Sequence, residues 1–249
     1  MKYAKKVLML GLGLAMCVTL LASCSGGQTG GSPAPGAAAL ATVASGKLTM
    51  STNAQFPPYE MAKGDGSFEG IDVEVAGKIA EKLGLELVVD DMDFDAALLA
   101  AQNGKSDIVM AGVTVNEERL AVMDFSDSYA KGVQVIIVKE GSPIATVDDL
   151  ATADKIGTQR GTTGNIYCSD DYGDEHVTAY DDGATAVQAL KNGQVDAVVI
   201  LDTEYANEDY AIGMKKGNTA LLDAVNGALK ELIADGTVQA IVDKYIPAE

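Results

Sequence analysis

Apolar residues recur along this chain with two different periods, which predict helices and strands in alternation. Within Ile71–Gly84 they recur at helical spacing, so that one face carries Val75, Ala76, Ile79, Ala80 and Leu83. The same spacing predicts helices over Ala96–Gln102, Gly183–Lys191 and Val238–Tyr245, a helix start at Gly164–Cys168, and a long amphipathic helix after Asn218 with Leu221, Leu222, Val225, Leu229, Leu232 and Ile233. Short apolar or alternating runs predict strands at Lys47–Thr52, Leu85–Val89, Asp107–Val113, Gly132–Val138, Lys155–Gln159, Val177–Ala179, Val195–Ile200 and Asp209–Met214.

The order of these elements predicts an α/β fold built from two units. Strands and helices alternate once up to Val113 and again from Lys155 to Ile200, which is typical of mostly parallel sheets. The long apolar strand Gly132–Val138 joins the two alternations. A chain of about 200 residues beyond the N-terminal segment is long enough to bury a core as one domain or as two small lobes.

A polar cluster follows the strand Asp107–Val113, at the point where a short helix is expected to begin. Thr114 and Glu117 have the spacing of a capping box, and Arg119 falls in or near the first helical turn. The start of a helix presents free backbone N–H groups and the positive end of its dipole, and a guanidinium and a hydroxyl beside it suit a carboxylate. These residues predict a site for the carboxylate of a small organic acid. The alternative is a surface arginine that pairs with Glu117 or Glu118.

The first residues have the pattern of a targeting segment. Three lysines precede the apolar run Val7–Ala22, which is short for a membrane span and fits the core of a signal peptide. The run ends in Leu21-Ala-Ser-Cys24, which looks like a bacterial lipobox, so we expect a signal peptide at 1–23 and a lipid on the Cys24 thiol. The alternative is a plain signal peptide cleaved near the small residues. Residues 24–45 are mostly Gly, Ser, Pro, Thr and Ala, which predicts a flexible tether.

The charge of the chain excludes several classes of partner. The formal net charge is −18, and loss of residues 1–23 would remove three lysines and no acid, leaving about −21. Nucleic-acid binding requires clustered basic residues, and anionic lipid headgroups attract positive segments, so neither is an expected partner. We expect contact with the membrane through the lipid anchor on Cys24. An acidic surface suits an exported protein.

Cysteine and histidine are too few for several kinds of site. Cys17 would leave with the signal peptide and Cys24 would carry lipid, which leaves Cys168 without a disulfide partner as a small buried residue. His176 is the only histidine, so a clustered histidine zinc site is excluded, and the glycine-rich Gly157–Gly164 lacks the lysine of a P-loop. We expect no metal, no cofactor and no catalytic residue.

Six motifs together carry a resemblance to a known family. They are Asn53-Ala-Gln-Phe-Pro-Pro-Tyr-Glu60, Gly70-Ile-Asp-Val-Glu74, Gly104-Lys-Ser-Asp107, Met110–Tyr129, Gly157–Gly164 and Gly193-Gln-Val-Asp-Ala-Val198. In this order they resemble the extracellular solute-binding proteins of ABC importers, family 3, which bind polar amino acids. The resemblance covers nearly all of Gly46 to Pro247. It implies a two-lobed, type II periplasmic-binding-protein-like fold, with lobe 1 at 46–131 and 208–249, lobe 2 at 132–207, and the ligand in the cleft between them.

The resemblance also implies which residues hold an amino acid's charged groups. In the family the arginine of this motif grips the ligand α-carboxylate, which here is Arg119, with Thr114 beside it. The Gly112 carbonyl would be available to the ligand ammonium. Thr162 and Thr163, at the start of the next helix, would hold the same carboxylate from the second lobe. The alternative role of these two threonines is helix capping, and one residue can do both.

Aromatic and amide side chains would form the rest of the ligand site. Phe56 and Phe94 would face the ligand side chain, and aromatic faces can also hold an ammonium group. Core packing is the alternative for Phe94. Asn53, at a strand end, is a candidate to bond a polar ligand side chain. We interpret Tyr59 and Glu60 as structural.

The sequence departs from the family in the second lobe. Strand Val195–Ile200 is followed by strand Asp209–Met214 after only eight residues, Leu201 to Glu208, where the family has a helix and another strand. We therefore expect a second lobe shortened by about one helix and one strand. It would either fold with an exposed sheet edge or fail to close around its ligand. The family's ammonium-binding aspartate lies in the missing part, and Asp202 could replace it or simply occupy a turn.

The function implied by the resemblance is an amino-acid receptor with three partners. It would be a lipid-anchored, extracytoplasmic monomer that binds a free amino acid and delivers it to the permease of an ABC importer. One alternative is a dehydratase-like enzyme of the same superfamily that acts on a cyclic acid, for which Glu60 is the one nearby candidate as general acid. The other is a sensory binding module with weakened ligand affinity.

Overall fold

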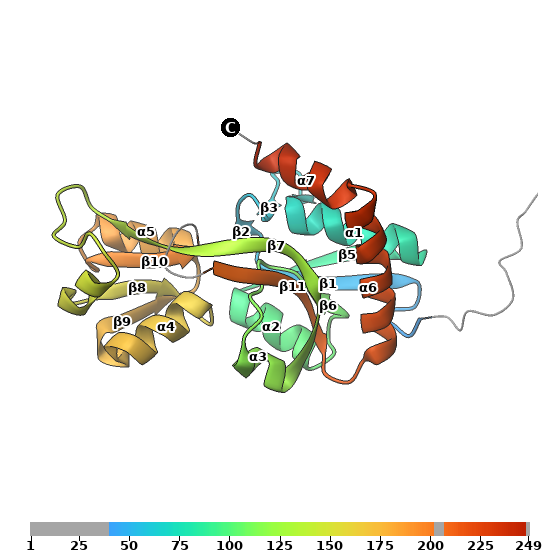
Figure 1. The fold of residues 1–249 in the computed structure, drawn as a ribbon, viewed down its shortest axis with the longest axis horizontal. Coiled ribbons are helices and arrows are strands. Elements are labelled where there is room, and N and C mark those ends of the chain that lie inside the picture. The colour runs from blue at the N-terminus through green and yellow to red at the C-terminus, as the bar shows by residue number, and fades with distance from the viewer. Residues whose placement is uncertain (1–39, 202–206, 248–249) are drawn as a thin grey trace, which may run out of the picture. The chain divides into compact units, whose positions relative to one another are not determined.

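Strands and connecting helices alternate along the chain as the apolar runs predict (Figure 1). The computed structural model describes residues 40–201 and 207–247. The helices are α1 (Ile71–Leu83), α2 (Phe94–Gln102), α3 (Glu117–Val122), α4 (Thr163–Tyr172), α5 (Gly183–Lys191), α6 (Thr219–Ala234) and α7 (Thr237–Tyr245), with short 3₁₀ turns η1 (Asp148–Thr152) and η2 (Asp174–His176). The strands are β1 (Lys47–Thr52), β2 (Gln55–Phe56), β3 (Glu60–Ala62), β4 (Phe68–Glu69), β5 (Glu86–Asp91), β6 (Ile108–Val109), β7 (Met123–Val138), β8 (Ile156–Gln159), β9 (Val177–Tyr180), β10 (Ala197–Leu201) and β11 (Asn207–Lys215).

The described strands form one large mixed sheet and one small sheet. The large sheet has the order β5-β1-β6-β11-β7-β10-β8-β9, and the small one has the order β2-β3-β4. At one end of the large sheet β1 is parallel to β5 and β6, and at the other end β8 is parallel to β9 and β10. In the middle, β7 is antiparallel to both β10 and β11. Strand β11 is also antiparallel to β6, so the sheet is parallel at its ends, where helices connect the strands, and antiparallel in the middle, where β11 and β7 pair with their neighbours.

Strand β7 spans both parts of the fold. Its residues Met123–Val133 pair with β11, and its residues Gln134–Val138 pair with β10. Figure 1 shows β7 and β11 as two neighbouring ribbons between two groups of helices. We call the part with β1–β6, β11, α1–α3, α6 and α7 the first lobe, and the part with β8–β10, α4 and α5 the second lobe. The lobe boundaries at 131/132 and 207/208 stay predictions.

The second lobe ends at an edge of β7 that no described strand covers. Only residues 202–206 separate β10 from β11, and the flanking Leu201 and Asn207 pair with adjacent β7 residues, Gln134 and Val133. The strand order puts β10 and β11 on opposite sides of β7. Along Gln134–Val138, β7 therefore pairs on one side only within the described residues, which agrees with the unpaired sheet edge expected from the short connection.

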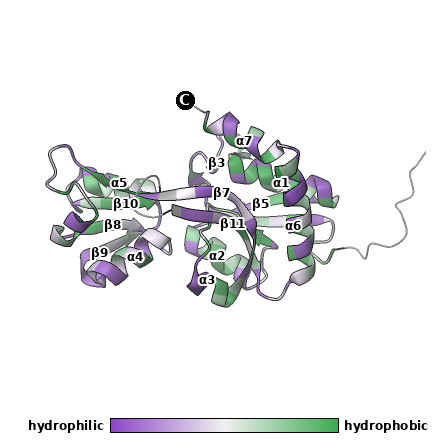
Figure 2. Cartoon of the chain, viewed as in Figure 1, coloured by the Kyte–Doolittle hydropathy of each residue, from purple (hydrophilic) through white to green (hydrophobic). Residues whose placement is uncertain are grey.

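Each lobe has its own apolar core on both faces of its sheet. In the first lobe one cluster joins β1 and β11 to α1, α6 and α7, and a second joins β6 and β7 to α2. In the second lobe one cluster places Cys168 of α4 against Ala197 and Val199, and another places Ala186 of α5 against Val198. Figure 2 shows hydrophobic residues along β10 and both colours on the helices, as expected for helices with one buried face.

Several sequence-based boundaries need correction. The expected strand Asp107–Val113 is paired only at Ile108–Val109, and β7 begins nine residues before the expected Gly132. The small sheet β2-β3-β4 was not predicted. In α6 the side chain of Ile233 is 47% exposed, so it does not belong to the buried face on which the pattern placed it.

Candidate functional site

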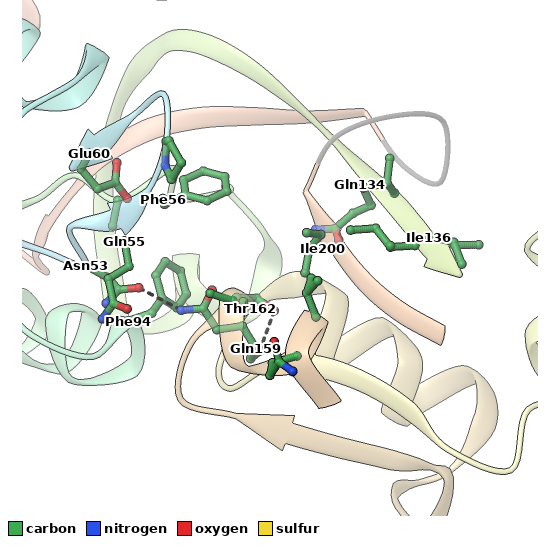
Figure 3. A pocket seen from close by; sticks show the side chains of 18 of the residues that line it. Asn53, Gln55, Phe56, Glu60, Phe94, Gln134, Ile136, Gln159, Thr162 and Ile200 are labelled. Carbon is green, nitrogen blue, oxygen red and sulfur yellow. Dashed lines mark hydrogen bonds between the residues drawn. The ribbon is translucent and has the colours of Figure 1, made fainter. Parts of the chain in front are cut away.

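A cavity of about 770 Å³ lies where the two lobes meet, and residues of both lobes line it (Figure 3). The first lobe contributes Asn53, Gln55, Phe56, Pro57, Glu60, Phe94 and Ala111. The second lobe contributes Gln159 and Thr162, residues of β7 and β10 from Gln134 to Ile137 and at Ile200, and residues of α5. A cavity of this size, mostly apolar with a few polar groups, suits a small organic ligand.

Arg119 lies beside this cavity as a buried cation. Its side chain is 7% exposed, and Asn116 caps the start of α3 by accepting a hydrogen bond from the Arg119 backbone N–H at 2.8 Å. The guanidinium donates to the backbone carbonyls of Thr114 at 2.7 Å and Gly161 at 3.0 Å, and it lies 5.5 Å from the ring centre of Phe94. Burial lowers the pKa of Arg119 to about 10, although nearby Glu208 opposes the shift. The guanidinium forms no ion pair with any described residue.

The expected role of Thr114 in helix capping is wrong. Helix α3 begins at Glu117, so its cap is Asn116 and not Thr114. The hydroxyl of Thr114 is instead buried and donates to the Glu208 carboxylate at 2.6 Å. The surface alternative for Arg119 is also wrong, because Arg119 is buried and its guanidinium bonds backbone carbonyls and not Glu117 or Glu118.

A polar network continues from Thr114 into the second lobe. Glu208, at the start of β11, is 4% exposed and also accepts a hydrogen bond from Gln134 Nε2, at 3.4 Å to Oε1 and 3.3 Å to Oε2. The same Gln134 nitrogen donates to Thr163 Oγ1 at 2.8 Å. Buried polar groups are normally fully paired, so this chain of four side chains is a defined feature of the region.

Two contacts join the lobes directly at the cavity. Gln159 Nε2 donates to Asn53 Oδ1 at 2.9 Å, which Figure 3 shows as a dashed line, and Arg119 reaches Gly161 as described. Asn53 is held in place because its own amide nitrogen donates to the Met92 carbonyl at 3.1 Å. Both contacts connect the first lobe to the end of β8 and the turn that follows it.

The floor of the cavity near Gly112 is held by buried acids. Asp72 accepts hydrogen bonds from the Gly112 backbone N–H at 2.9 Å and from the Tyr129 hydroxyl at 2.7 Å. Gly112 has a φ of 57°, and a Cβ there would lie 2.9 Å from Phe56 Cε1, so only glycine fits between this turn and the aromatic wall. Burial raises the pKa of Asp72 to about 6, and burial together with Asp72 raises the pKa of Glu60 well above its usual value.

The structure brings most of the predicted site residues together. Asn53, Phe56, Phe94 and Thr162 line the cavity. Three more do not line it but contact residues that do: Gly112 approaches Phe56, Thr163 bonds Gln134, and Arg119 packs over Phe94. Thr114 lies one contact further away, where its carbonyl accepts a hydrogen bond from Arg119. Asp202 and Cys24 lie outside the described residues.

Thr162 also has the alternative role in helix capping. Its hydroxyl accepts a hydrogen bond from the Asn165 backbone N–H at 3.2 Å at the start of α4, and it donates to the Gln159 carbonyl at 2.8 Å. Capping and a place in the cavity wall are therefore combined in one residue.

Sequence reasoning missed three polar residues of this region: Gln134, Gln159 and Glu208. Gln134 had a usable signal, because it is the one polar side chain within the apolar strand Gly132–Val138. Gln159 lies in a recognised motif but has no feature of its own. Glu208 reaches Thr114 only through the pairing of distant strands, which local sequence does not reveal.

Within residues 40–201 and 207–247, no group of three or more His, Cys, Asp or Glu side chains is arranged to hold a metal ion. In the same part of the chain, no helix combines the length and the apolar character that a membrane crossing requires.

The model of one family, described as bacterial extracellular solute-binding proteins, family 3, matches residues 48–248. This chain belongs to that family. It is 29% identical to a probable histidine-binding protein of Neisseria gonorrhoeae, covering 94% of this chain and 93% of the relative. It is 31% identical to the L-cystine-binding protein TcyJ of Escherichia coli K12, covering 82% and 84%.

Solved structures support the same two-lobed family 3 fold. An ancestral arginine-binding protein bound to glutamine aligns with a TM-score of 0.76 at 35% identity, covering 82% of this chain and 99% of that one. An ancestral amino-acid-binding protein described as a precursor of cyclohexadienyl dehydratase aligns with a TM-score of 0.74 at 29% identity, covering 80% and 95%. The relatives of this family 3 chain are thus amino-acid-binding proteins, and the family is extracellular.

Proposed function

We propose that this chain is the substrate-binding lipoprotein of an ABC importer, binding a free amino acid between its lobes and delivering it to a membrane permease. The observation that carries the proposal is Arg119: a buried guanidinium that lies between the lobes and bonds only to backbone carbonyls. Glu208 is nearby but forms no ion pair with the guanidinium, so a ligand carboxylate would supply a direct anionic partner in a bidentate arrangement.

The surroundings of Arg119 support an amino acid as the ligand. Thr162 adds a hydroxyl group to the cavity wall, and Phe56 and Phe94 provide aromatic walls for a side chain. The named ligands of relatives include histidine, cystine, glutamine and arginine, all of which carry an α-carboxylate. Which of these this chain prefers depends on the cavity wall, where Asn53, Gln55 and Gln159 are available to a polar side chain.

Binding would close the lobes around the ligand. The contacts Asn53–Gln159 and Arg119–Gly161 are the interlobe bonds that such a closed state uses. Ligand contacts that exist only in the closed state would drive the motion, which occurs by hinge bending of the strands between the lobes. Transport energy would come from the importer's ATPase. The lipobox-like Leu21–Cys24 would tether the receptor, as a monomer, to the outer face of the cell membrane.

Calorimetric titration of the full chain in detergent, with histidine, cystine, glutamine and arginine in turn, tests this proposal. We expect one class to bind at micromolar or tighter affinity, and Arg119→Ala to weaken that binding more than about 100-fold, because a charged bidentate pair is lost. Arg160→Ala is the matched control, since Arg160 lies on the same turn as Gly161 but pairs at the surface with Asp181. Unchanged affinity in Arg119→Ala would remove the carboxylate assignment.

One observation keeps a second candidate, a dehydratase-like enzyme, in view. Glu60 lines the cavity, and its raised pKa would keep it protonated as a general acid. Its position beside Asp72, which accepts a hydrogen bond from the Gly112 backbone N–H, equally suits a structural carboxyl.

Two experiments separate these candidates from a receptor. Incubation with a cyclic hydroxy acid, followed by NMR detection of the product that has lost water, would favour the enzyme. Ligand binding without stimulation of a permease would favour a sensor.

A further inference from the structure

The cavity between the lobes is larger than a ligand such as glutamine requires. Its volume is about 770 Å³. Even at the volume per heavy atom of liquid water, about 30 Å³, the ten heavy atoms of glutamine would fill only about 300 Å³. A ligand of that size therefore leaves more than half of the cavity unfilled.

The additional space follows helix α5 of the second lobe. One face of this helix lines the cavity over two turns, through Gly183, Ala184, Val187, Gln188 and Lys191. A helix rises about 1.5 Å per residue, so this wall is about 12 Å long. A Cβ on Gly183 would lie 3.9 Å from Gln159 Oε1, which places the start of the wall beside the polar contact between the lobes. Lys191 therefore lies at the far end of the wall.

The middle of this part of the cavity is apolar. Ile137, Val187 and Ile200 line it, and all three are half-buried and pack against the same second-lobe core cluster. In Figure 3, Ile200 lies on the side of Gln159 away from Asn53. Contact with an apolar part of a ligand would remove more of these three side chains from water, which favours binding.

The far end of the wall is positively charged. Two of the described residues that line the cavity are ionisable, Glu60 and Lys191. Burial and the neighbouring Asp72 carboxylate raise the pKa of Glu60 well above its usual value, which favours the neutral form. Lys191 is exposed and forms no ion pair with any described residue. An anionic group on a ligand would complement this lysine.

We propose that the cavity binds an amino acid with a long side chain, whose apolar segment lies along α5 and whose terminal carboxylate reaches Lys191. This inference rests on the proposed function and names the class of ligand: α-amino dicarboxylic acids longer than glutamate. At about 1.2 Å per bond in an extended chain, the terminal carboxyl carbon lies about 4 Å from Cα in glutamate and about 7 Å in 2-aminosuberate. The flexible Lys191 side chain covers the rest of a wall about 12 Å long.

A series of ligands that differ only in length tests the apolar wall. Glutamate, 2-aminoadipate, 2-aminopimelate and 2-aminosuberate are titrated in turn into the full chain in detergent, by calorimetry. Each additional methylene group that is buried should tighten binding about two- to fourfold, so 2-aminosuberate should bind at least about 10-fold more tightly than glutamate. Equal affinities along the series, or a fall with length, would refute the inference.

Ala184→Phe fills this part of the cavity. Ala184 is an exposed residue of α5, so the helix can carry a larger side chain there. Affinity for 2-aminosuberate should fall about 10-fold, to that of glutamate, while affinity for glutamate stays within about threefold. Equal weakening of both ligands would contradict the assignment of the long side chain to α5. If this variant fails to fold, the length series still decides.

Lys191→Met tests the terminal carboxylate. An exposed ion pair contributes little, so this variant should weaken the binding of 2-aminosuberate about two- to fivefold. It should leave 2-aminooctanoate unchanged, because that amino acid has the same length but ends in a methyl group. Lys105→Met, which removes an exposed lysine of the first lobe that does not line the cavity, is the control and should change neither affinity. Equal effects of Lys191→Met on both ligands would refute the role of Lys191.

The failure of this inference is distinct from that of the proposed function. If the unaltered chain binds neither the four relatives' ligands nor any member of the length series, the proposed function fails, and this inference fails with it. Binding of short amino acids without a preference for longer side chains would refute this inference alone.

Discussion

The contact between Gly132 and Tyr210 allows a sharp prediction about the strands that join the lobes. A Cβ on residue 132 would lie 1.9 Å from Tyr210 Oη and 2.0 Å from Cζ, far inside an ordinary van der Waals contact of about 3.5–4.0 Å. Tyr210 is 1% exposed and cannot move freely, because its ring meets Tyr59 edge-on at 5.2 Å and Tyr59 stacks on Phe56 at 5.4 Å. Gly132→Ala therefore forces a row of packed aromatic rings to shift.

The magnitude follows from the cost of overpacking. Extra methyl groups in a packed core cost about 1–3 kcal/mol, and an overlap this deep belongs at the upper end, about 3 kcal/mol. For a chain of this size 1 kcal/mol corresponds to about 2–4 °C, so the melting temperature should fall by about 6–12 °C. Because the row ends at Phe56 in the cavity wall, amino-acid affinity should fall as well.

Gly227→Ala is the matched control for this measurement by differential scanning calorimetry. Gly227 lies inside α6 with no atom within 4 Å of its added Cβ, so alanine should stabilise the helix by about 0.5–1 kcal/mol. A Gly132→Ala variant that melts within about 2 °C of the unaltered chain would refute the reasoning, because about 3 kcal/mol predicts a far larger fall.

Two further predictions concern buried acids. The pKa of Asp72 is raised to about 6 from a usual 3.8, and the pKa of Glu60 is also raised, so in this range the folded chain holds protons that the unfolded chain has released. The free energy of unfolding therefore falls as the pH rises through this range. Glu60→Gln should melt at a higher temperature than the unaltered chain by a margin that grows from about pH 4 to pH 8, and a margin independent of pH would contradict this. The buried Asp107 (4% exposed) accepts hydrogen bonds from the Val43 and Thr49 backbone N–H groups and from the Thr49 hydroxyl. Asp107→Ala leaves these donors unpaired and should lower the free energy of unfolding, measured in urea, by about 2–3 kcal/mol. Asp65→Asn, at an exposed position, is the control and should leave it unchanged.

Local sequence patterns predicted the helices because their starts and ends carry their own signals. Helix α5 matches its predicted bounds, with Asp182 capping its start through the Thr185 backbone N–H at 2.7 Å. Helix α1 ends where Gly84 adopts a φ of 69°, which favours glycine. Helix starts and ends that depend only on neighbouring residues could therefore be predicted from the sequence.

Strands were predicted less well because pairing depends on distant residues. The first half of β7 carries an alternation of Met123, Phe125 and Tyr129 that indicates a strand, but the polar residues between them obscured it. The small sheet β2-β3-β4 consists of strands of two or three residues, too short for any period to appear. The Thr114–Glu208 bond spans 94 residues, and neither residue signals the other.

The contacts between the lobes and the unpaired sheet edge lie in different parts of the second lobe. From the sequence, the missing segment left two outcomes open: a lobe that folds with an unpaired edge, or one that fails to close. The unpaired edge runs along Gln134–Val138 of β7, on the side where β11 lies. The interlobe bonds come instead from Gln159, at the end of β8, and from Gly161 in the turn before α4, on the other side of β10. Since β8 and α4 pack against Ala197 and Val199, the groups that join the lobes belong to a part of the second lobe that lies away from the unpaired edge.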